Sequence, residues 1–267
     1  MFRFVKSSVR GVVRRLGYDL TPLSPGRAGP SPGYPADFDE ATLRLCQEVG
    51  PFTMTSPERI VALRDAVAYV IRHEIPGDIV ECGVWKGGSM MASAFGLLAL
   101  DSTQRQLHLY DTFTGMPEAA QVDIDMFGRP ARELMRQATP EAELIRARCS
   151  LGEVKEALMQ TRYPWEKIHF VPGRIETTLP EHAPDEIALL RLDTDWYQST
   201  YHALEHLYPR LVEGGVLIVD DYGHWQGAKK AVDDYFHKSG IDADLRTIDY
   251  TGRLLVKRPR LALPKAA

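Results

Sequence analysis

Two short apolar runs in the second half of the chain end abruptly in carboxylates. Leu190-Arg191-Leu192 leads into Asp193-Thr194-Asp195, and Val216-Leu217-Ile218-Val219 leads into Asp220-Asp221. Runs of this length are typical of strands buried on both faces of a parallel sheet, in which ligands bind beyond the carboxyl ends of the strands. If the two strands are neighbours, four carboxylates meet at one edge, and charges about 4 Å apart repel by roughly 4 kcal/mol at an effective dielectric constant of 20. A hard divalent cation bound by oxygens would offset that repulsion, so the pattern predicts a metal site.

Strands and helical segments alternate from residue 77 onward. Further strands are expected at 77–83, 107–111 and 168–173, and a helix is expected over 89–100. This alternation predicts a doubly wound, mostly parallel α/β sheet with right-handed crossovers. Near the end of the chain, residues 245–248 and 253–257 flank Tyr250-Thr251-Gly252, which predicts a C-terminal antiparallel hairpin.

The chain is expected to divide into an arm with a linker, at 1–35, and one domain, at 36–267. Residues 1–18 interleave basic and apolar side chains without an acid, and residues 21–35 contain five prolines. The first pattern is typical of an amphipathic helix and the second of a linker. The arm is expected either to make peripheral contact with the inner face of a membrane or to pack on a partner subunit or on the body of the protein.

Composition narrows the class of partner and the compartment. Three widely spaced cysteines fit a reducing compartment, so a cytoplasmic protein is expected. A formal charge of −4 argues against nucleic acid as the main partner.

A long segment, about 114–166, separates the second and third expected strands. It has helical patterns at 131–138 and 141–160. An insertion of this size at the carboxyl edge of a sheet predicts a helical lid over the site. Ahead of the first strand, Thr55-Ser56-Pro57-Glu58 predicts a capping box that opens a helix over 59–73.

The first expected strand leads into a glycine-rich turn, Glu81-Cys82-Gly83-Val84-Trp85-Lys86-Gly87-Gly88-Ser89. Glycines let the backbone approach a ligand, so we expect cofactor contacts at Gly83, Gly87 and Ser89, and Asp111 at the next strand tip is placed to bind ribose hydroxyls. NAD and S-adenosylmethionine (SAM) both contain that ribose. The spacing departs from the dinucleotide fingerprint, and Glu81 puts negative charge where a pyrophosphate would lie. SAM, with its ammonium and sulfonium cations, is therefore favoured over NAD; a purely structural turn is the alternative.

Several segments together resemble the macrocin O-methyltransferases, a family of SAM- and Mg²⁺-dependent enzymes that methylate sugar hydroxyls of macrolide and aminocoumarin glycosides. The matching segments are 81–88, 110–117, 171–173 with 178–180, 192–200, 207–211 and 214–223. They follow the family's order over about residues 50–257, whereas the arm and much of 118–165 fall outside. The resemblance implies a class I SAM-dependent methyltransferase fold and a homo-oligomer.

The family pattern also implies roles for individual residues. Asp193, Asp220 and Asp221 would bind Mg²⁺, and Asp195 would be the general base beside them. The residues implied to hold SAM are Glu81, Gly83 and Asp111, with Arg174, Ile175 and Glu176 near the adenine and Thr55 and Glu58 closing over the methionine end. Two alternatives stay open: Asp195 caps the helix that begins near Trp196, and His224 serves as the base.

The predicted function is transfer of a methyl group from SAM to a hydroxyl of a sugar, in a small glycoside, a glycolipid or a polysaccharide. Mg²⁺ would activate and orient that hydroxyl. The alternatives are a phenolic or catechol acceptor, a nicotinamide-dependent oxidoreductase, and a non-catalytic SAM-binding scaffold subunit.

Overall fold

The computed structural model describes residues 34–258. The predicted arm at 1–18 and most of the predicted linker lie outside the described residues. The chain forms two compact units, 1–48 and 49–267. In the described part of the first unit, helix α2 (Glu40–Val49) begins after Asp39, whose Oδ1 accepts a hydrogen bond from the backbone N–H of Thr42 at 2.8 Å. That contact satisfies a backbone donor which the helix itself leaves free.

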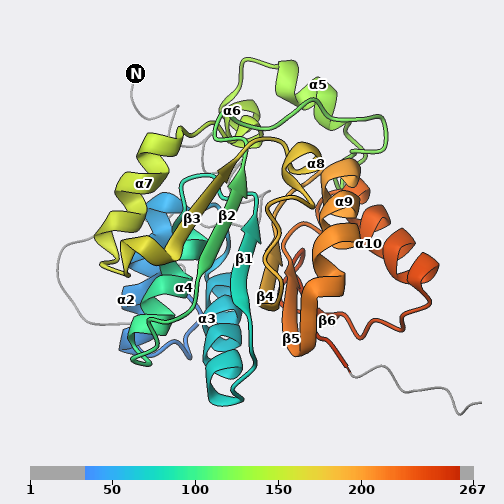
Figure 1. Ribbon diagram of the computed structural model, residues 1–267. Helices are drawn as coiled ribbons and strands as arrows, with labels where there is room; N and C mark the ends of the chain where they lie inside the picture. Colours follow the sequence, from blue (N-terminus) through green and yellow to red (C-terminus); the bar gives the residue numbers. More distant parts are fainter. Residues whose placement is uncertain (1–33, 259–267) are drawn as a thin grey trace, which may run out of the picture. The chain divides into compact units, whose positions relative to one another are not determined.

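The second unit contains a seven-stranded sheet in the order β3-β2-β1-β4-β5-β7-β6 (Figure 1). The strands are β1 (Asp78–Cys82), β2 (Leu107–Asp111), β3 (Ile168–Pro172), β4 (Ile187–Leu192), β5 (Leu211–Val219), β6 (Arg246–Thr247) and β7 (Arg253–Val256). The first five are parallel, and β7 is antiparallel to both β5 and β6. The predicted doubly wound, mostly parallel sheet and the predicted C-terminal hairpin are confirmed.

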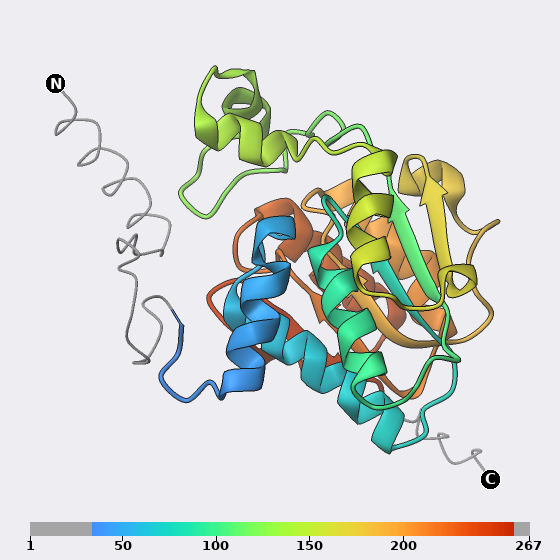
Figure 2. The same ribbon diagram turned by 90° about the vertical axis from the view of Figure 1, so that its left-hand side faces the viewer.

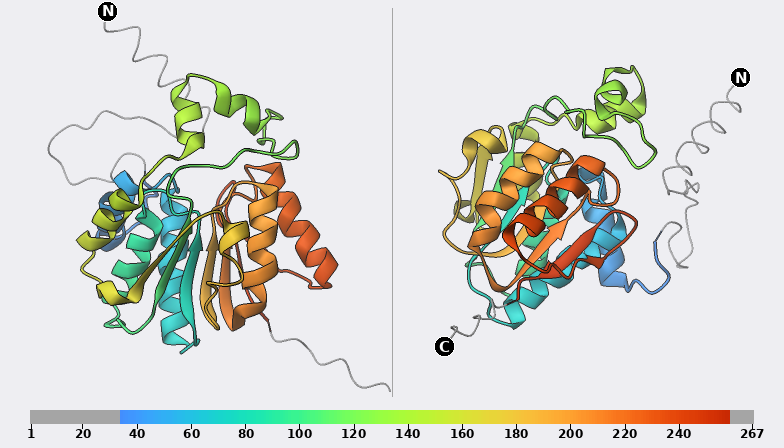
Figure 3. Two further views of the ribbon diagram at one scale, coloured as in Figure 1. Left: turned by 45° about the horizontal axis from the view of Figure 1, so that its top comes forward. Right: turned by 90° about the vertical axis from the view of Figure 1, so that its right-hand side faces the viewer.

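Helices cover both faces of this sheet (Figure 3). One face carries α3 (Pro57–Arg72), α4 (Gly88–Leu98) and α7 (Leu151–Gln160), and the other carries α8 (Ile175–Thr178), α9 (Tyr197–Leu207) and α10 (Gln226–Ser239). Single-turn 3₁₀ helices lie at Gly50–Phe52, Trp165–Lys167 and Tyr208–Arg210. Between residues 34 and 258, no helix combines the length and the apolar composition needed to cross a membrane.

The apolar runs form strands because both of their faces are covered. Every residue of β4 is buried, and Leu190 and Leu217 of adjacent strands pack in one cluster with Ala203 of α9 and Val232 of α10. Full burial of a leucine side chain contributes about 1.5–3 kcal/mol relative to its exposure. This packing keeps the strand ends, and the polar residues that follow them, in a fixed register.

The strand order reverses between β1 and β4, which opens a crevice at the carboxyl ends of the strands. Cys82 is paired with Leu192, and Leu192 is paired with Val219. The residues that follow these three strand ends therefore start from the same edge of the sheet. This is where the two predicted carboxylate-tipped strands lie side by side.

The insertion between β2 and β3 extends beyond that edge and includes α5 (Ala131–Arg136) and α6 (Pro140–Arg146) (Figure 2). The helical pattern expected at 141–160 corresponds to two helices, α6 and α7, with a break between them. The chain breaks at Ala147, which has a left-handed φ of 45°, and a capping box between Ser150 and Glu153 starts α7. Because α7 packs against α4 on a face of the sheet, the part of the insertion beyond the edge ends before α7.

Asp123 ties the insertion to the body of the unit. Its carboxylate accepts hydrogen bonds from the backbone of Ala120 at 2.7 Å and from the backbone of Tyr197, at the start of α9, at 2.8 Å. The backbone of Gln226, at the start of α10, donates to the carbonyl of Ile124 at 2.8 Å. Two helix N-termini that need acceptors are thus satisfied by the insertion.

The start of α3 differs from the prediction. The N-cap is Ser56, whose side chain accepts from the backbone of Arg59, and Pro57 occupies the first helical position. The predicted capping box of Thr55 with Glu58 is therefore wrong, because Thr55 lies one residue too early and its hydroxyl accepts from Arg191 at 2.7 Å. Glu58 is exposed in the first turn.

Candidate active site

Three carboxylates gather where β4 and β5 end. Asp193, Asp195 and Asp221 each offer one oxygen, and these oxygens all lie within 4.8 Å of one another. Burial, and then the charges of Asp221 and Asp193, raise the pKa of Asp195 well above its ordinary value. Burial, and then the charge of Asp193, raise the pKa of Asp221 to about 7. The crowded cluster therefore favours either bound protons or a bound cation.

Asp195 has a left-handed backbone conformation, which is uncommon for a residue other than glycine. Its φ is +57°, in the left-handed region, and its N–H donates to Asp221 Oδ2 at 3.1 Å. The alternative that Asp195 caps the following helix is wrong, because the N-cap of α9 is Trp196 and the first helical N–H, that of Tyr197, donates to Asp123.

Asp220 faces a different set of groups from its neighbour Asp221. Its Oδ2 accepts a hydrogen bond from Arg59 Nη1, and its Oδ1 accepts from Arg191 Nη2. Both partners are buried, so each oxygen already has a charged donor. Of the three residues implied to bind Mg²⁺, the structure thus brings Asp193 and Asp221 together with Asp195 and turns Asp220 toward arginines.

Arg191 joins the groups on either side of the β1–β4 crevice. It belongs to β4, and its side chain is 3% exposed. Its Nη1 donates to Glu81 Oε1 at 2.6 Å and to Asp193 Oδ2 at 2.9 Å. Its Nη2 donates to Thr55 Oγ1 at 2.7 Å and to Asp220. One planar guanidinium therefore orients three carboxylates at the strand ends, a geometry that lysine does not reproduce.

Arg59 extends this network to the C-terminal hairpin. Its Nε donates to Asp249 Oδ2 at 2.9 Å, and Ser56 Oγ donates to the same oxygen at 2.7 Å. In the hairpin turn, Thr251 Oγ1 donates to the carbonyl of Asp220 at 2.8 Å. The hairpin thus holds both the backbone of Asp220 and the arginine that contacts its side chain.

Glu81, at the penultimate position of β1, has one satisfied and one unsatisfied oxygen. Oε1 accepts from Arg191, whereas Oε2 is buried and has no hydrogen-bond partner among residues 34–258. Burial is the largest influence on this carboxyl, and its pKa rises to about 8 although Arg191 opposes the shift. Buried carboxylate oxygens are rarely left without a partner, so Glu81 has a place for a donor such as an ammonium group.

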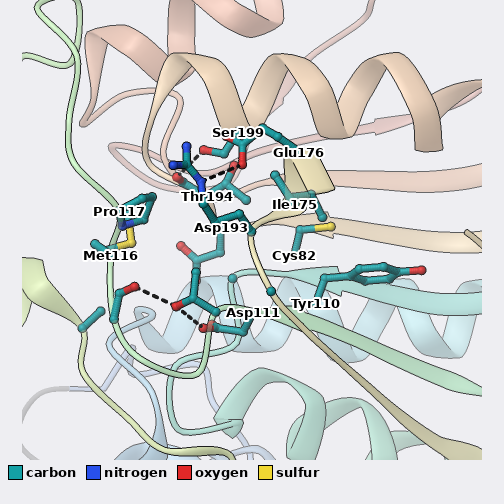
Figure 4. Close-up of a pocket in the computed structure, with 16 residues that line it drawn as sticks. Cys82, Tyr110, Asp111, Met116, Pro117, Ile175, Glu176, Asp193, Thr194 and Ser199 are labelled. Carbon is teal, nitrogen blue, oxygen red and sulfur yellow. Dashed lines mark hydrogen bonds and ion pairs between the residues drawn. The ribbon is translucent and has the colours of Figure 1, made fainter. Parts of the chain in front are cut away.

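A pocket that opens to solvent lies at this edge of the sheet, next to Cys82 and Gly83, which follow Glu81 in the chain (Figure 4). Six of the predicted site residues form part of its wall: Gly83, Asp111, Arg174, Ile175, Glu176 and Asp193. The other predicted cofactor residues in the described chain, Thr55, Glu58, Glu81, Gly87 and Ser89, are outside that wall. Asp193 belongs to both the cavity wall and the carboxylate cluster, so the two features adjoin.

Two glycines of the glycine-rich turn pack so closely against neighbouring residues that a larger side chain would not fit. Gly83 has a φ of +83°, and a Cβ there would lie 1.8 Å from the carbonyl oxygen of Asp193. Gly87, the N-cap of α4, has a φ of +92°, and a Cβ there would lie 2.7 Å from Leu158. Ser89 is buried in the first turn of α4. Only glycine fits the two positive-φ positions without strain.

Asp111 holds the same turn in place. Its Oδ2 accepts from the backbone of Val84 at 2.7 Å and of Trp85 at 3.0 Å, and its Oδ1 accepts from the backbone of Phe113 at 2.8 Å. The carboxylate still forms part of the cavity wall. Asp111 thus supports the turn, and its contact with a ribose stays a prediction.

His224 lies on the β5 side of the site. Its backbone N–H donates to the carbonyl of Asp221 at 3.0 Å, and its Nδ1 is 3.5 Å from the hydroxyl of Tyr250. Burial lowers the pKa of His224, so the neutral imidazole, the form that accepts a proton, is favoured. Its ring packs against Trp225 and Tyr250, and its role as the alternative base stays a prediction.

The donors fit the two groups that the family pattern implies. Among residues 34–258, this network joins two arginines, Arg59 and Arg191, with six carboxylates: Glu81, Asp193, Asp195, Asp220, Asp221 and Asp249. Three clustered carboxylate oxygens suit Mg²⁺, which prefers hard oxygen ligands. The unpartnered Glu81 Oε2 suits an ammonium group, and SAM carries one.

Two residues in this site were given no role from the sequence. Arg191 stands alone as a charged residue inside an apolar strand, and this signal predicts buried acidic partners. Arg59 gave no comparable signal, because an arginine in the first turn of a helix is ordinary in a sequence. Only the folded chain shows it beside Asp220.

Comparisons with known proteins show the family of this chain. The family model described as Macrocin-O-methyltransferase (TylF) matches residues 39–257. Demethyldecarbamoylnovobiocin O-methyltransferase of Streptomyces niveus is 34% identical over 200 residues, which cover 75% of this chain and 73% of that protein. Mycinamicin III 3''-O-methyltransferase of Micromonospora griseorubida is 32% identical over 200 residues, which cover 75% and 76% of the two chains.

Solved structures show the same relationship. The O-methyltransferase NovP matches with a TM-score of 0.69 and 34% identity over 78% of this chain and 83% of NovP. The calicheamicin methyltransferase CalS11, at 19% identity and a TM-score of 0.60 over 88% and 99% of the chains, shows the fold alone. These matches confirm the predicted resemblance and the class I methyltransferase fold. The chain therefore belongs to the macrocin O-methyltransferase family of SAM-dependent O-methyltransferases.

Proposed function

We propose that this protein transfers the methyl group of SAM to a sugar hydroxyl with the help of Mg²⁺. The observation that carries the proposal is the position of Asp193, which contributes both to the wall of the pocket and to the carboxylate cluster. A methyl donor in the cavity and a hydroxyl at the cluster would then be neighbours. The relatives named above support a sugar acceptor, since one of them is a mycinamicin III 3''-O-methyltransferase.

Each residue of the site has a proposed role. Asp193 and Asp221 would hold Mg²⁺, and when bound the ion would supply Lewis-acid activation of the acceptor hydroxyl. Asp195 would accept the hydroxyl proton on a carboxylate oxygen, because its oxygen lies within 4.8 Å of those of Asp193 and Asp221. Glu81 would receive the ammonium group of SAM, and Arg191 would keep Glu81 and Asp193 in register.

The direct test is a methyl-transfer assay with SAM and purified full-length protein. Acceptors would include a deoxysugar glycoside, a glycolipid and a polysaccharide fragment, with a catechol as the rival class, and products would be identified by mass spectrometry. Methylation of a sugar hydroxyl supports the proposal, whereas methylation of the catechol alone contradicts the sugar assignment. Tight binding of NAD without binding of SAM would instead favour the oxidoreductase alternative.

Removal of divalent metal should abolish turnover. We expect EDTA to reduce methyl transfer at least about a hundredfold, because the acceptor hydroxyl loses its Lewis acid, and we expect Mg²⁺ in excess to restore it. Calorimetry of S-adenosylhomocysteine with and without EDTA is the control, since cofactor binding should survive. Full turnover in EDTA would contradict the metal assignment.

The variants Asp221→Asn and Asp220→Asn distinguish two possible sets of Mg²⁺ ligands. One set includes Asp220, as the family pattern implies, and the other does not. Both oxygens of Asp220 already accept from arginines, so we expect Asp220→Asn to weaken Mg²⁺ binding less than Asp221→Asn does. Mg²⁺ affinity can be measured by competition with Mn²⁺ in electron paramagnetic resonance. Equal losses in the two variants would support the ligand role that the resemblance implies for Asp220.

Glu81→Gln should weaken SAM binding by about 10- to 150-fold, the equivalent of roughly 1.5–3 kcal/mol for a hydrogen bond to a charged group. The reason is that Oε2 has no partner among the described residues and is free to receive the ammonium group. Calorimetry gives the affinity. Glu156→Gln, at an exposed position of α7 outside the cavity wall, is the matched control for loss of a carboxylate charge, and equal affinity of Glu81→Gln and the unaltered protein would exclude the ammonium contact.

A further inference from the structure

A second group of metal-ligand side chains lies on α9, away from the carboxylate cluster. His202, Glu205 and His206 are spaced i, i+3 and i+4, so they share one side of the helix. Each offers one ligand atom, and these atoms all lie within 4.8 Å of one another. The two imidazole rings have centroids 4.4 Å apart. Because an α-helix rises 1.5 Å per residue, Glu205 lies about 12 Å along the helix axis from Tyr197, the first residue of α9. This distance separates the group from the carboxylate cluster, which lies near the start of α9.

One nitrogen in this group lacks a partner. His202 Nε2 is buried, and within the described chain no hydrogen-bond partner reaches it. A buried ring nitrogen without a donor, an acceptor or a metal is costly, and such groups call for an explanation.

The neighbouring histidine brings a second imidazole to the same side of α9. His206 follows His202 by four residues, and neutral imidazole is the form that binds metals. Glu205 is exposed and supplies a carboxylate beside the two rings.

We propose that His202, Glu205 and His206 form a second metal site, which takes borderline transition ions such as Zn²⁺, Co²⁺ or Ni²⁺. Two nitrogens and one oxygen match the ligands that Zn²⁺ uses in proteins, and they leave a position for water. Mg²⁺ prefers oxygen ligands throughout and should not compete here. The site therefore differs in chemistry from the carboxylate cluster, and it stands independently of the proposed acceptor.

The site would stabilise the helix that follows the catalytic loop. Its three ligands are neighbours only while α9 is helical, so an ion bound there favours the folded state. The α9 helix begins two residues after Asp195. A transition-metal ion bound by His202 and His206 would thus stabilise α9, the helix that follows the carboxylate cluster in the chain.

The test is a titration of the full-length protein with Co²⁺ in the presence of millimolar Mg²⁺, followed by visible absorption, together with thermal melts in Zn²⁺. We expect one ion per chain that Mg²⁺ does not displace, and a higher melting temperature in Zn²⁺. His202→Gln and His206→Gln should each lower the Co²⁺ affinity by at least about tenfold, the low end of what even outer-shell changes cost. The matched control is His237→Gln, an exposed histidine in the last turn of α10, which should leave the affinity unchanged.

Two results would overturn the proposal. The first is the absence of Mg²⁺-resistant Co²⁺ binding in the unaltered protein, and the second is binding that survives in both His202→Gln and His206→Gln. Glu205→Gln provides a further variant at an exposed position if a histidine variant does not fold, and it should also weaken Co²⁺ binding. Unchanged affinity in Glu205→Gln would remove the carboxylate from the site and contradict the three-ligand assignment.

Discussion

Replacement of Arg191 by methionine should destabilise the folded protein by about 3–5 kcal/mol, the usual cost of removing one partner from a buried ion pair. The side chain is 3% exposed and donates to Glu81 and Asp220, which are 1% and 3% exposed, and to Asp193, which is 30% exposed, so its loss removes a charged partner from two carboxylates that have little access to water. Because a typical domain is stable by only 5–15 kcal/mol, the variant should unfold at a much lower urea concentration. Urea denaturation followed by circular dichroism measures the change.

Two companion variants make this result specific. Arg174→Met removes an arginine whose side chain is 54% exposed and should change stability by less than about 1 kcal/mol. Glu81→Gln combined with Arg191→Met should be less destabilised than the sum of the single changes, because one of the stranded charges is gone. A loss below 1 kcal/mol in Arg191→Met would show that the carboxylates find other partners or bind protons at little cost.

Asp195→Asn should lower kcat by about 10²- to 10⁴-fold, the usual contribution of a general base. Asparagine keeps the size of the side chain and tolerates the left-handed φ of +57° at this position, so the backbone of the loop should be preserved. The variant should bind S-adenosylhomocysteine as tightly as the unaltered protein does. Steady-state kinetics and calorimetry check the two expectations separately.

The outcome of Asp195→Asn also distinguishes the alternative roles at this edge. A kcat within threefold of the unaltered value would exclude Asp195 as the base, and a strong loss in His224→Gln would then assign the proton to His224. A parallel fall in Mg²⁺ affinity in Asp195→Asn would instead make Asp195 a metal ligand. Mg²⁺ affinity must therefore be measured in this variant, because an oxygen of Asp195 lies within 4.8 Å of oxygens of Asp193 and Asp221.

The sequence pattern was sufficient to predict where the strands of the sheet lie along the chain. The expected strand at 107–111 coincides with β2, and the expected strands at 77–83 and 168–173 contain β1 and β3 with one or two extra residues at the ends. Apolar runs bounded by turn residues predict buried strands reliably, because burial of both faces leaves little other choice. The helical pattern at 141–160 did not reveal the break between α6 and α7, because the left-handed conformation of Ala147 leaves no signal in such a pattern.

The sequence by itself determined which residues stand at the carboxyl edge, since Asp193, Asp195, Asp220 and Asp221 follow directly from their strands. Which groups those carboxylates face was decided by the tertiary structure. Arg191 and Glu81 are 110 residues apart, and Arg59 and Asp220 are 161 residues apart. Local periodicity specifies burial, whereas the pairing of buried charges depends on how distant segments pack. For that reason the acidic edge could be predicted from the chain alone, but the arginines that turn Asp220 away from the cluster could not.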